Sequence, residues 1–315
     1  MPLLNLKGFM KKIAFVFPGQ GSQQVGMGKE FYDNFKIARA VFEEADDSLR
    51  FSISALCFKG PEENLKLTEN TQPAVLTTSI AALKVLQEET EIQPQFTAGH
   101  SLGEYSALVA SGSLSFRDAV RVVRLRGKFM QEAVPAGEGA MAAVLGMERQ
   151  EVERLCEEAS SGEVLTPANF NSPGQIVISG HVHAVHRAME IVKQRGKKAL
   201  LLPVSAPFHS PLMKPAGMRL GEVLEGISLK ELDIPVVTNA EAIANTSVER
   251  VKPLLIDQVS SPVRWEESMR KIVAEGIEQI VEIGPGKVLT GLMKRIDPEV
   301  DLKNVEDIQS LRKMI

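Results

Sequence analysis

Apolar runs alternate along the chain with longer segments of helical periodicity. Ile13–Phe17 is a continuous apolar run, which is typical of a parallel strand covered on both faces. Gln95–Ala98, Ile234–Asn239 and Gln279–Ile283 are further predicted strands. Apolar residues at helical spacing predict helices between them, most clearly over residues 29–49, 73–89 and 116–133, with Pro73 in a first turn. The pattern therefore predicts an α/β fold with a mainly parallel sheet.

The order of predicted elements changes after about Pro135. Strands are predicted at residues 140–145, 164–169, 175–179 and 199–204, with helices at 148–159 and 182–195. This βαββαβ order is that of the ferredoxin-like split βαβ unit. We expect a large, hydrolase-like α/β domain formed by residues 11–134 and 205–315, and a small ferredoxin-like subdomain, residues 135–204, inserted into it with a cleft between them. Residues 1–10 are interpreted as an N-terminal extension.

Composition narrows the class of protein. The chain has 315 residues, 44% hydrophobic and 24% charged, and a net charge of −4 without long runs of either sign, which favours neither nucleic-acid nor membrane-surface binding. No segment approaches the ~18 apolar residues of a membrane span, and no signal peptide is evident. Cys57 and Cys156 are too few for a disulfide framework. We expect a cytoplasmic protein and, because no helix has an evident apolar outer face, a monomer.

The residues Gly99-His100-Ser101-Leu102-Gly103 fit the G-x-S-x-G nucleophile elbow, a turn that raises a serine between a strand and a helix. A predicted strand ends at Ala98, and a helix-forming run extends from Glu104 to Ser111. The glycines leave room for backbone crowding, and the new helix points N–H groups at the serine. The alternative is a glycine-bounded turn with a helix-capping serine, but the flanking elements favour a nucleophilic Ser101.

Arg126 departs from the charge pattern of its predicted helix. Arg117, Arg121, Arg124 and Lys128 form a solvated stripe, whereas Arg126 falls at the centre of the apolar face. An arginine in that position is costly unless an anion pairs with it. Periodicity leaves three interpretations open: an ion pair with an internal Asp or Glu, a side chain that reaches solvent, and a binding site for a substrate carboxylate.

Two further segments carry candidate chemistry. His209 lies between two prolines in a stiff loop, which suits a base that must hold its position, although a plain exposed histidine is the alternative. The turn Gly19-Gln20-Gly21 leaves the first strand and could bind phosphate or an oxyanion, or simply connect two elements. Three more histidines cluster near a predicted helix start: His181, His183 and His186. No ligand arrangement typical of a metal site surrounds them, and we interpret them as surface residues.

Five motifs taken together resemble the malonyl-CoA:acyl-carrier-protein transacylase family in its discrete bacterial type. They are, in family order, Gly19-Gln20-Gly21-Ser22-Gln23, Gly99-His100-Ser101-Leu102-Gly103-Glu104, Arg126-Gly127, Phe208-His209 and Gly284-Pro285-Gly286. Each motif is weak alone. The set is highly specific, and the resemblance extends from about Lys11 to Arg295.

The resemblance implies a ping-pong transfer of the malonyl group from malonyl-CoA to the phosphopantetheine thiol of acyl carrier protein, which supplies fatty-acid chain elongation. Ser101 would be the nucleophile that carries the malonyl group, and His209 would be the general base. Gln258 would orient this histidine through its backbone carbonyl. The backbone N–H groups of Gln20 and Leu102 would form the oxyanion hole.

The resemblance also implies that Arg126 binds the free malonyl carboxylate as a bidentate pair. It implies no metal and no cofactor, only the substrates malonyl-CoA and holo acyl carrier protein. The alternative is a serine hydrolase or thioesterase of the α/β-hydrolase or patatin-like type. Against it, no acidic residue is evidently placed between elbow and histidine, and a patatin-like enzyme would use an Asp instead of His209. A non-enzymatic carrier-protein docking module would need neither Ser101 nor a central Arg126.

Overall fold

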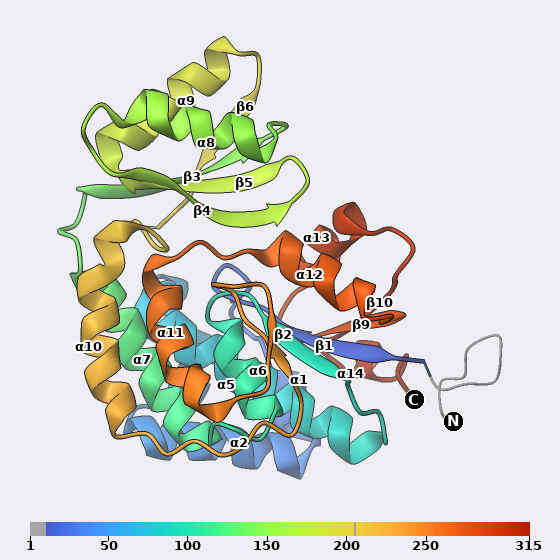
Figure 1. Cartoon of the computed structure of the whole chain (residues 1–315). Helices are drawn as coiled ribbons and strands as arrows, with labels where there is room; N and C mark the ends of the chain where they lie inside the picture. Colours follow the sequence, from blue (N-terminus) through green and yellow to red (C-terminus); the bar gives the residue numbers. More distant parts are fainter. Residues whose placement is uncertain (1–10, 205) are drawn as a thin grey trace.

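Two separate β-sheets organise the molecule in the computed structural model, which describes residues 11–204 and 206–315 (Figure 1). The larger sheet has the strand order β10-β9-β1-β2-β7-β8. The bounds of its strands are Ile13–Phe17 (β1), Phe96–Gly99 (β2), Val236–Val237 (β7), Ala244–Asn245 (β8), Gln279–Ile283 (β9) and Asp301–Val305 (β10). All neighbours pair in parallel except β7 and β8, so the predicted mainly parallel sheet is confirmed. The predicted extension, residues 1–10, lies outside the described residues.

The helices around this sheet differ from the prediction at two places. Their bounds are Lys29–Asn34 (α1), Lys36–Leu49 (α2), Ile53–Lys59 (α3), Glu62–Leu65 (α4), Thr68–Glu89 (α5), Gly103–Ala110 (α6), Phe116–Glu132 (α7), Lys214–Glu225 (α10), Val251–Ser260 (α11), Trp265–Ala274 (α12), Val288–Ile296 (α13) and Ile308–Leu311 (α14). The extended backbone of Phe35 divides the helix predicted over residues 29–49. The placement of Pro73 in a first turn is wrong, because α5 begins at Thr68 and Pro73 lies inside it. The hydroxyl of Thr71 donates to the Leu65 carbonyl at 2.6 Å and holds the true first turn.

Both faces of the larger sheet are buried, as the apolar sequence of β1 indicates. Phe15 and Phe17 belong to a core that includes residues of α2, α5 and α7, whereas Ala14 and Val16 belong to a second core around Trp265. Helices therefore cover the sheet on both sides. Among residues 11–204 and 206–315, no helix combines the length and the apolarity needed to cross a bilayer.

The second sheet has the strand order β4-β5-β3-β6, and every neighbouring pair is antiparallel. Its elements are Gly139–Leu145 (β3), Arg149–Ser160 (α8), Leu165–Ser172 (β4), Gln175–His181 (β5), Val182–Gln194 (α9) and Lys198–Leu201 (β6). With β5 between β3 and β4, this is the split βαβ arrangement that the sequence predicts. In Figure 1, α8 and α9 cover one face of this sheet, and the larger part of the molecule lies on its other side. The subdomain boundaries at residues 135 and 204 remain a prediction.

Alternate residues of β5 face different cores. Ile176 and Ile178 pack with apolar residues of α8 and α9, whereas Val177 between them joins the core of the larger part. Hydrogen bonds add to this contact, since the N–H of Phe170 in β4 donates to the Val263 carbonyl at 2.9 Å. The two sheets are therefore joined by apolar packing and by backbone hydrogen bonds.

Candidate active site

The chain turns sharply between the end of β2 at Gly99 and the start of α6 at Gly103, and Ser101 occupies the turn with a φ of 50°. That left-handed backbone is unfavourable for a residue with a Cβ. A Cβ on Gly99 would lie 1.9 Å from the Gly103 carbonyl, and one on Gly103 would lie 2.1 Å from the carbonyl oxygen of Phe17. The strand, the crowded turn and the helix that the G-x-S-x-G pattern predicts are all present.

Ser101 and His209 meet although 108 positions separate them. The Oγ of Ser101 lies 2.7 Å from Nε2 of His209. On the other side of the ring, Nδ1 lies 2.9 Å from the carbonyl oxygen of Gln258 and 3.2 Å from that of Ser261. Because a carbonyl oxygen only accepts hydrogen bonds, Nδ1 carries the proton, and Nε2 is left to accept the hydroxyl proton of Ser101.

The environment of His209 keeps its imidazole neutral. The residue is 4% exposed. Burial, and then the positive charge of Arg126, lower the pKa of His209 to about 3. The ring is therefore unprotonated at neutral pH, which is the state a general base requires.

Arg126 lies beside the serine, and its hydrogen-bond acceptors in the described part of the chain are uncharged. It projects from α7 and is 1% exposed. Its Nη2 donates to Oγ of Ser101 at 3.0 Å and to Oε1 of Gln258 at 2.9 Å, and its Nη1 donates to Oε1 of Gln72 at 2.9 Å. Within the described residues, no ion pair includes Arg126. Neither an internal ion pair nor access to solvent accounts for its position.

The turn that follows β1 packs against the elbow. A Cβ on Gly19 would lie 2.4 Å from the carbonyl oxygen of His100, so the turn contacts the residue that precedes Ser101. In the part of the chain that the structure describes, the backbone N–H groups of Gln20 and Leu102 donate to no protein acceptor, whereas that of Ser101 donates to Oδ1 of Asn239 at 2.6 Å. The N–H groups of Gln20 and Leu102 are therefore available to an oxyanion.

Comparison with known proteins gives the family of this chain. Residues 14–314 match the family model described as acyl transferase domain. The malonyl CoA-acyl carrier protein transacylase of Bacillus subtilis (strain 168) is 52% identical over 304 residues, which cover 96% of each chain. That of Escherichia coli (strain K12) is 49% identical over 288 residues, 91% of this chain and 93% of the other. The chain belongs to the malonyl CoA-acyl carrier protein transacylase family.

Solved transacylase structures share the fold of nearly the whole chain. The acyl carrier protein S-malonyltransferase of Vibrio cholerae has a TM-score of 0.94 at 46% identity, and the match covers 96% of this chain and 100% of that one. A malonyl-transacylase in complex with a type II PKS acyl-carrier protein also has a TM-score of 0.94 at 46% identity, over 96% of this chain and 98% of that one. The predicted fold class is confirmed.

Three residues of this candidate site have no role predicted from the sequence: Gln72, Asn239 and Glu104, although Glu104 belongs to the quoted elbow motif. Gln72 is an acceptor for Arg126, and Asn239 donates from Nδ2 to the Gly99 carbonyl at 2.7 Å. Glu104 is 2% exposed, and burial raises its pKa to about 7. Gln72 and Asn239 are uncharged and give no recognisable signal in the sequence. Glu104 is a charged residue in the first turn of a largely apolar helix, and this signal could have identified it.

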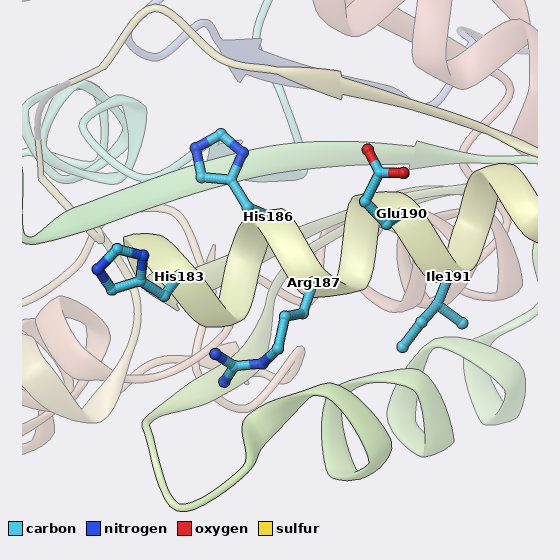
Figure 2. Close-up of a pocket in the computed structure, with 5 residues that line it drawn as sticks. All are labelled: His183, His186, Arg187, Glu190 and Ile191. Carbon is cyan, nitrogen blue, oxygen red and sulfur yellow. The ribbon is translucent and has the colours of Figure 1, made fainter.

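An open groove of about 690 Å³ runs along α9 and shares no residue with the transacylase site (Figure 2). Its lining residues are His183, His186, Arg187, Glu190 and Ile191. Arg187 is already engaged, since its guanidinium donates to the carbonyls of Ala159 and Ser160 and to the Glu163 carboxylate. Among the described residues, no three histidine, cysteine, aspartate or glutamate side chains come together as a metal site.

Proposed function

We propose that the chain is an acyltransferase that moves the malonyl group from malonyl-CoA to the phosphopantetheine thiol of acyl carrier protein, and so supplies fatty-acid chain elongation. One observation carries the proposal. The Oγ of Ser101 lies 2.7 Å from a neutral histidine, His209, and 3.0 Å from a buried arginine, Arg126. A serine with a base fits many enzymes, but a buried arginine at the same oxygen favours an acyl group that carries its own carboxylate.

The first half-reaction loads the serine. The Oγ of Ser101 attacks the thioester carbonyl carbon of malonyl-CoA while its proton passes to Nε2 of His209. The free N–H groups of Gln20 and Leu102 donate to the oxyanion of the tetrahedral intermediate. The C–S bond then breaks, and the thiol of coenzyme A leaves with the proton from His209. The carbonyl of Gln258 keeps the ring in the tautomer that this step needs.

The second half-reaction transfers the malonyl group to the carrier protein. The phosphopantetheine thiol attacks the malonyl ester while His209 takes its proton, and the C–O bond to Ser101 breaks as the proton returns to Oγ. A thiol has a pKa near ~8.5 and leaves readily, so a carboxylate as a third catalytic group is not required. Because the exchange of one thioester for another is nearly thermoneutral, the site must protect the ester from water.

Arg126 is proposed to bind the malonyl carboxylate. Its present acceptors are the neutral oxygens of Ser101, Gln72 and Gln258, and an anion stabilises a buried guanidinium far better than neutral oxygens do. Acetyl-CoA offers no such anion. The site would therefore discriminate against acetyl donors, because they leave its buried charge unpaired.

A serine hydrolase or thioesterase is the second candidate, and two observations count against it. The Nδ1 of His209 faces the backbone carbonyls of Gln258 and Ser261, where a hydrolase triad would have a carboxylate. The relatives named transacylase also match nearly the whole chain. A patatin-like mechanism would need an aspartate in the position that His209 occupies.

The remaining features of the proposal concern partners and organisation. We propose malonyl-CoA and holo acyl carrier protein as substrates of a monomeric, cytoplasmic enzyme with no metal, further cofactor, nucleic acid or membrane partner. The complex of a related malonyl-transacylase with an acyl-carrier protein supports the second substrate. We also propose that residues 135–204 are a subdomain inserted between residues 11–134 and 205–315; its separate sheet and core support this division.

Mass spectrometry of the protein mixed with malonyl-CoA, with and without holo acyl carrier protein, tests the proposed function. We expect a malonyl ester on the peptide that contains Ser101, and its loss as the carrier protein becomes malonylated. Release of free malonate without malonylated carrier protein would favour the hydrolase. The absence of both adduct and turnover would refute both candidates.

A further inference from the structure

Glu104 is a buried carboxylate for which the proposed reaction has no role. It lies in the first turn of α6 and is 2% exposed. Its Oε2 accepts two hydrogen bonds, from the backbone N–H of Asn239 at 2.9 Å and from Nε2 of Gln258 at 2.8 Å. A buried carboxylate is costly. Both residues that stabilise this one also contact the residues around the nucleophile.

The side-chain amide of Gln258 connects Glu104 to Arg126. Its Nε2 donates to Glu104 and also to the carbonyl oxygen of Ser101 at 3.0 Å, and its Oε1 accepts from Nη2 of Arg126 at 2.9 Å. A carboxylate and a carbonyl only accept hydrogen bonds, whereas a guanidinium only donates them. If the amide were flipped, its oxygen would face the oxygens of Glu104 and Ser101, and its NH2 group would face the guanidinium of Arg126. Glu104 therefore helps to fix the orientation in which Gln258 can hold Arg126.

We propose that Glu104 is a positioning residue for donor specificity: through the side chain of Gln258 it keeps the guanidinium of Arg126 turned toward Ser101, where the acyl carboxylate binds. This inference rests on the proposed function. Gln72 holds Nη1 of Arg126 and Gln258 holds Nη2, each at 2.9 Å, so the planar group is fixed at two points. Without the hydrogen bond to Gln258, the guanidinium can rotate about its hydrogen bond to Gln72. A bidentate pair with a carboxylate tolerates little rotation of the guanidinium.

The same carboxylate oxygen also supports the elbow, through Asn239. The backbone N–H of Asn239 donates to Glu104, and its side chain holds the N–H of Ser101 at 2.6 Å and the carbonyl of Gly99 at 2.7 Å. Loosening of the elbow slows every acyl donor alike, whereas rotation of Arg126 slows only donors with a carboxylate. The ratio of malonyl to acetyl transfer separates the two effects.

Three variants of the full chain test the proposal. Glu104→Ala removes the acceptor, whereas Glu104→Gln can keep an oxygen in the place of Oε2 and with it both hydrogen bonds. Glu282→Ala is the matched control, because Glu282 is also buried and accepts from the N–H groups of Leu289 and Thr290 and from the Thr290 hydroxyl at the start of α13. Within the described residues it has no hydrogen bond to a residue of the site. For each variant, kcat/KM is measured with malonyl-CoA and with acetyl-CoA, together with Tm.

We expect Glu104→Ala to lower the malonyl-to-acetyl ratio by about 10- to 100-fold, because a misplacement of about 1 Å costs up to about 100-fold in rate. Glu104→Gln should restore the ratio to near that of the wild type. Glu282→Ala should lower Tm and leave the ratio unchanged. In an Arg126→Ala background, Glu104→Ala should not lower the ratio further, since the group that it positions is gone.

An unchanged ratio in Glu104→Ala, with both donors slowed equally, would overturn the proposal and leave Glu104 a purely structural role. A Glu104→Gln variant as impaired as Glu104→Ala would overturn it as well. If Glu104→Ala does not fold, Glu104→Asp takes its place in the test. The aspartate keeps the charge, but its shorter side chain places the carboxylate farther from Gln258, so the malonyl-to-acetyl ratio of this variant must fall. The wild type provides a separate check: if it does not malonylate holo carrier protein, the proposed function fails, whatever ratios the variants give.

Discussion

At the scale of single residues, Arg126 is the group that best distinguishes this site from that of a general serine enzyme. A guanidinium that is 1% exposed, and whose hydrogen-bond acceptors among the described residues are neutral oxygens, is costly to bury, and the nearby charge of Glu104 offsets part of this cost. An anion that enters the site lowers this cost. We therefore expect an acyl group with a carboxylate to gain more free energy on binding than one without.

Replacement of Arg126 by alanine should reverse the donor preference. A charge pair with one partner truncated typically loses about 2–5 kcal/mol, much of it from the stranded charge. Here the stranded charge is on malonyl-CoA, so acetyl transfer should equal or exceed that of the wild type. Measurements of kcat/KM for both donors and of Tm test this, with Arg121→Ala on the exposed side of α7 as the control. Parallel loss of both donors with a large fall in Tm would assign Arg126 a structural role.

The pH dependence of acylation should report the environment of His209. With a pKa of about 3, the base stays unprotonated where an ordinary histidine, with a pKa near ~6.5, would be protonated. We expect kcat/KM for acyl-enzyme formation to change little between about pH 7 and pH 5 when it is measured with acetyl-CoA, because protonation of Glu104, with its pKa of about 7, acts through Arg126 on donors with a carboxylate. Because the folded pKa lies below the unfolded value, this group should also make the free energy of unfolding decrease as the pH falls below about 6.5.

Arg126→Ala offers a control for that interpretation. Arg126 is one of the charges that lower the pKa of His209, so its removal should move the acid limb of the profile, measured with acetyl-CoA, to higher pH. An acid limb near pH ~6.5 in the wild type would contradict the neutral, buried base.

Loss of the nucleophile and loss of the base should have different consequences. Ser101→Ala should abolish the malonyl ester and leave the fold intact, whereas His209→Ala should slow acylation by about 10²–10⁴-fold. Quenched acylation assays with labelled malonyl-CoA measure both. Labelling of Ser101→Ala at the wild-type level would disprove the assignment of the nucleophile.

How far the sequence predicted these residues depended on their charge and neighbours. Ser101 is bracketed by glycines, and Arg126 interrupts an apolar helix face, so both have a local signal. Gln72 and Asn239 have none, because their roles come from contacts distant in sequence: Asn239 bonds to Ser101 across 138 positions. Hydrogen bonds of that kind leave no periodic pattern.

At the scale of elements, the elbow depends on close approach between backbones. Gly99 packs against Gly103, Gly103 against Phe17, and Gly19 against His100, with no room for a Cβ at any of the three glycines. Strands β1 and β2 and helix α6 can therefore meet at one point. That point is where Ser101 lies, and where we propose that the N–H groups of Gln20 and Leu102 bind the oxyanion.

Gly99→Ala should be far more damaging than an ordinary glycine substitution. Its Cβ would lie 1.9 Å from the backbone carbonyl of Gly103, which cannot move like a side chain. We expect destabilisation at or above the usual overpacking cost of about 1–3 kcal/mol, and no acyl-enzyme. Gly291→Ala in α13 is the control: its Cβ would meet no atom within 4 Å, and it should stabilise the helix by up to ~1 kcal/mol. Urea unfolding of both variants measures this, and wild-type stability for Gly99→Ala would contradict it.

Element boundaries were predicted less well than element types. The missing N–H of a proline is harmless in the first turn of a helix, which predicts a helix start near Pro73, but α5 begins at Thr68 and Pro73 lies in its second turn. The strand predicted over residues 234–239 is only Val236–Val237. A local pattern of apolar residues indicates the type of an element more directly than the residue at which it begins or ends.

At the scale of the whole molecule, the chain enters and leaves the second sheet at neighbouring points. A Cβ on Gly139 would lie 2.3 Å from Cδ of Pro207, so the two connections touch. Adjacent ends are a property of inserted domains. The local order of elements predicts the strands and helices of the second sheet, but not the contact of this sheet with the elbow, where Oδ1 of Asn171 in β4 lies 2.8 Å from Nε2 of His100.

The proposed boundaries predict that residues 135–204 fold when they are expressed alone. Two neighbouring residues of β5 make the test specific: Ile178 is buried in the subdomain's own core, whereas Val177 is buried against the larger part. Ile178→Ala should destabilise both the full chain and the isolated segment, by roughly 2–5 kcal/mol. Val177→Ala should destabilise the full chain but barely affect the segment, in which its side chain already meets water. Circular dichroism melts of both proteins measure the effects. A segment with no cooperative transition, or one equally sensitive to both substitutions, would contradict the proposed boundaries.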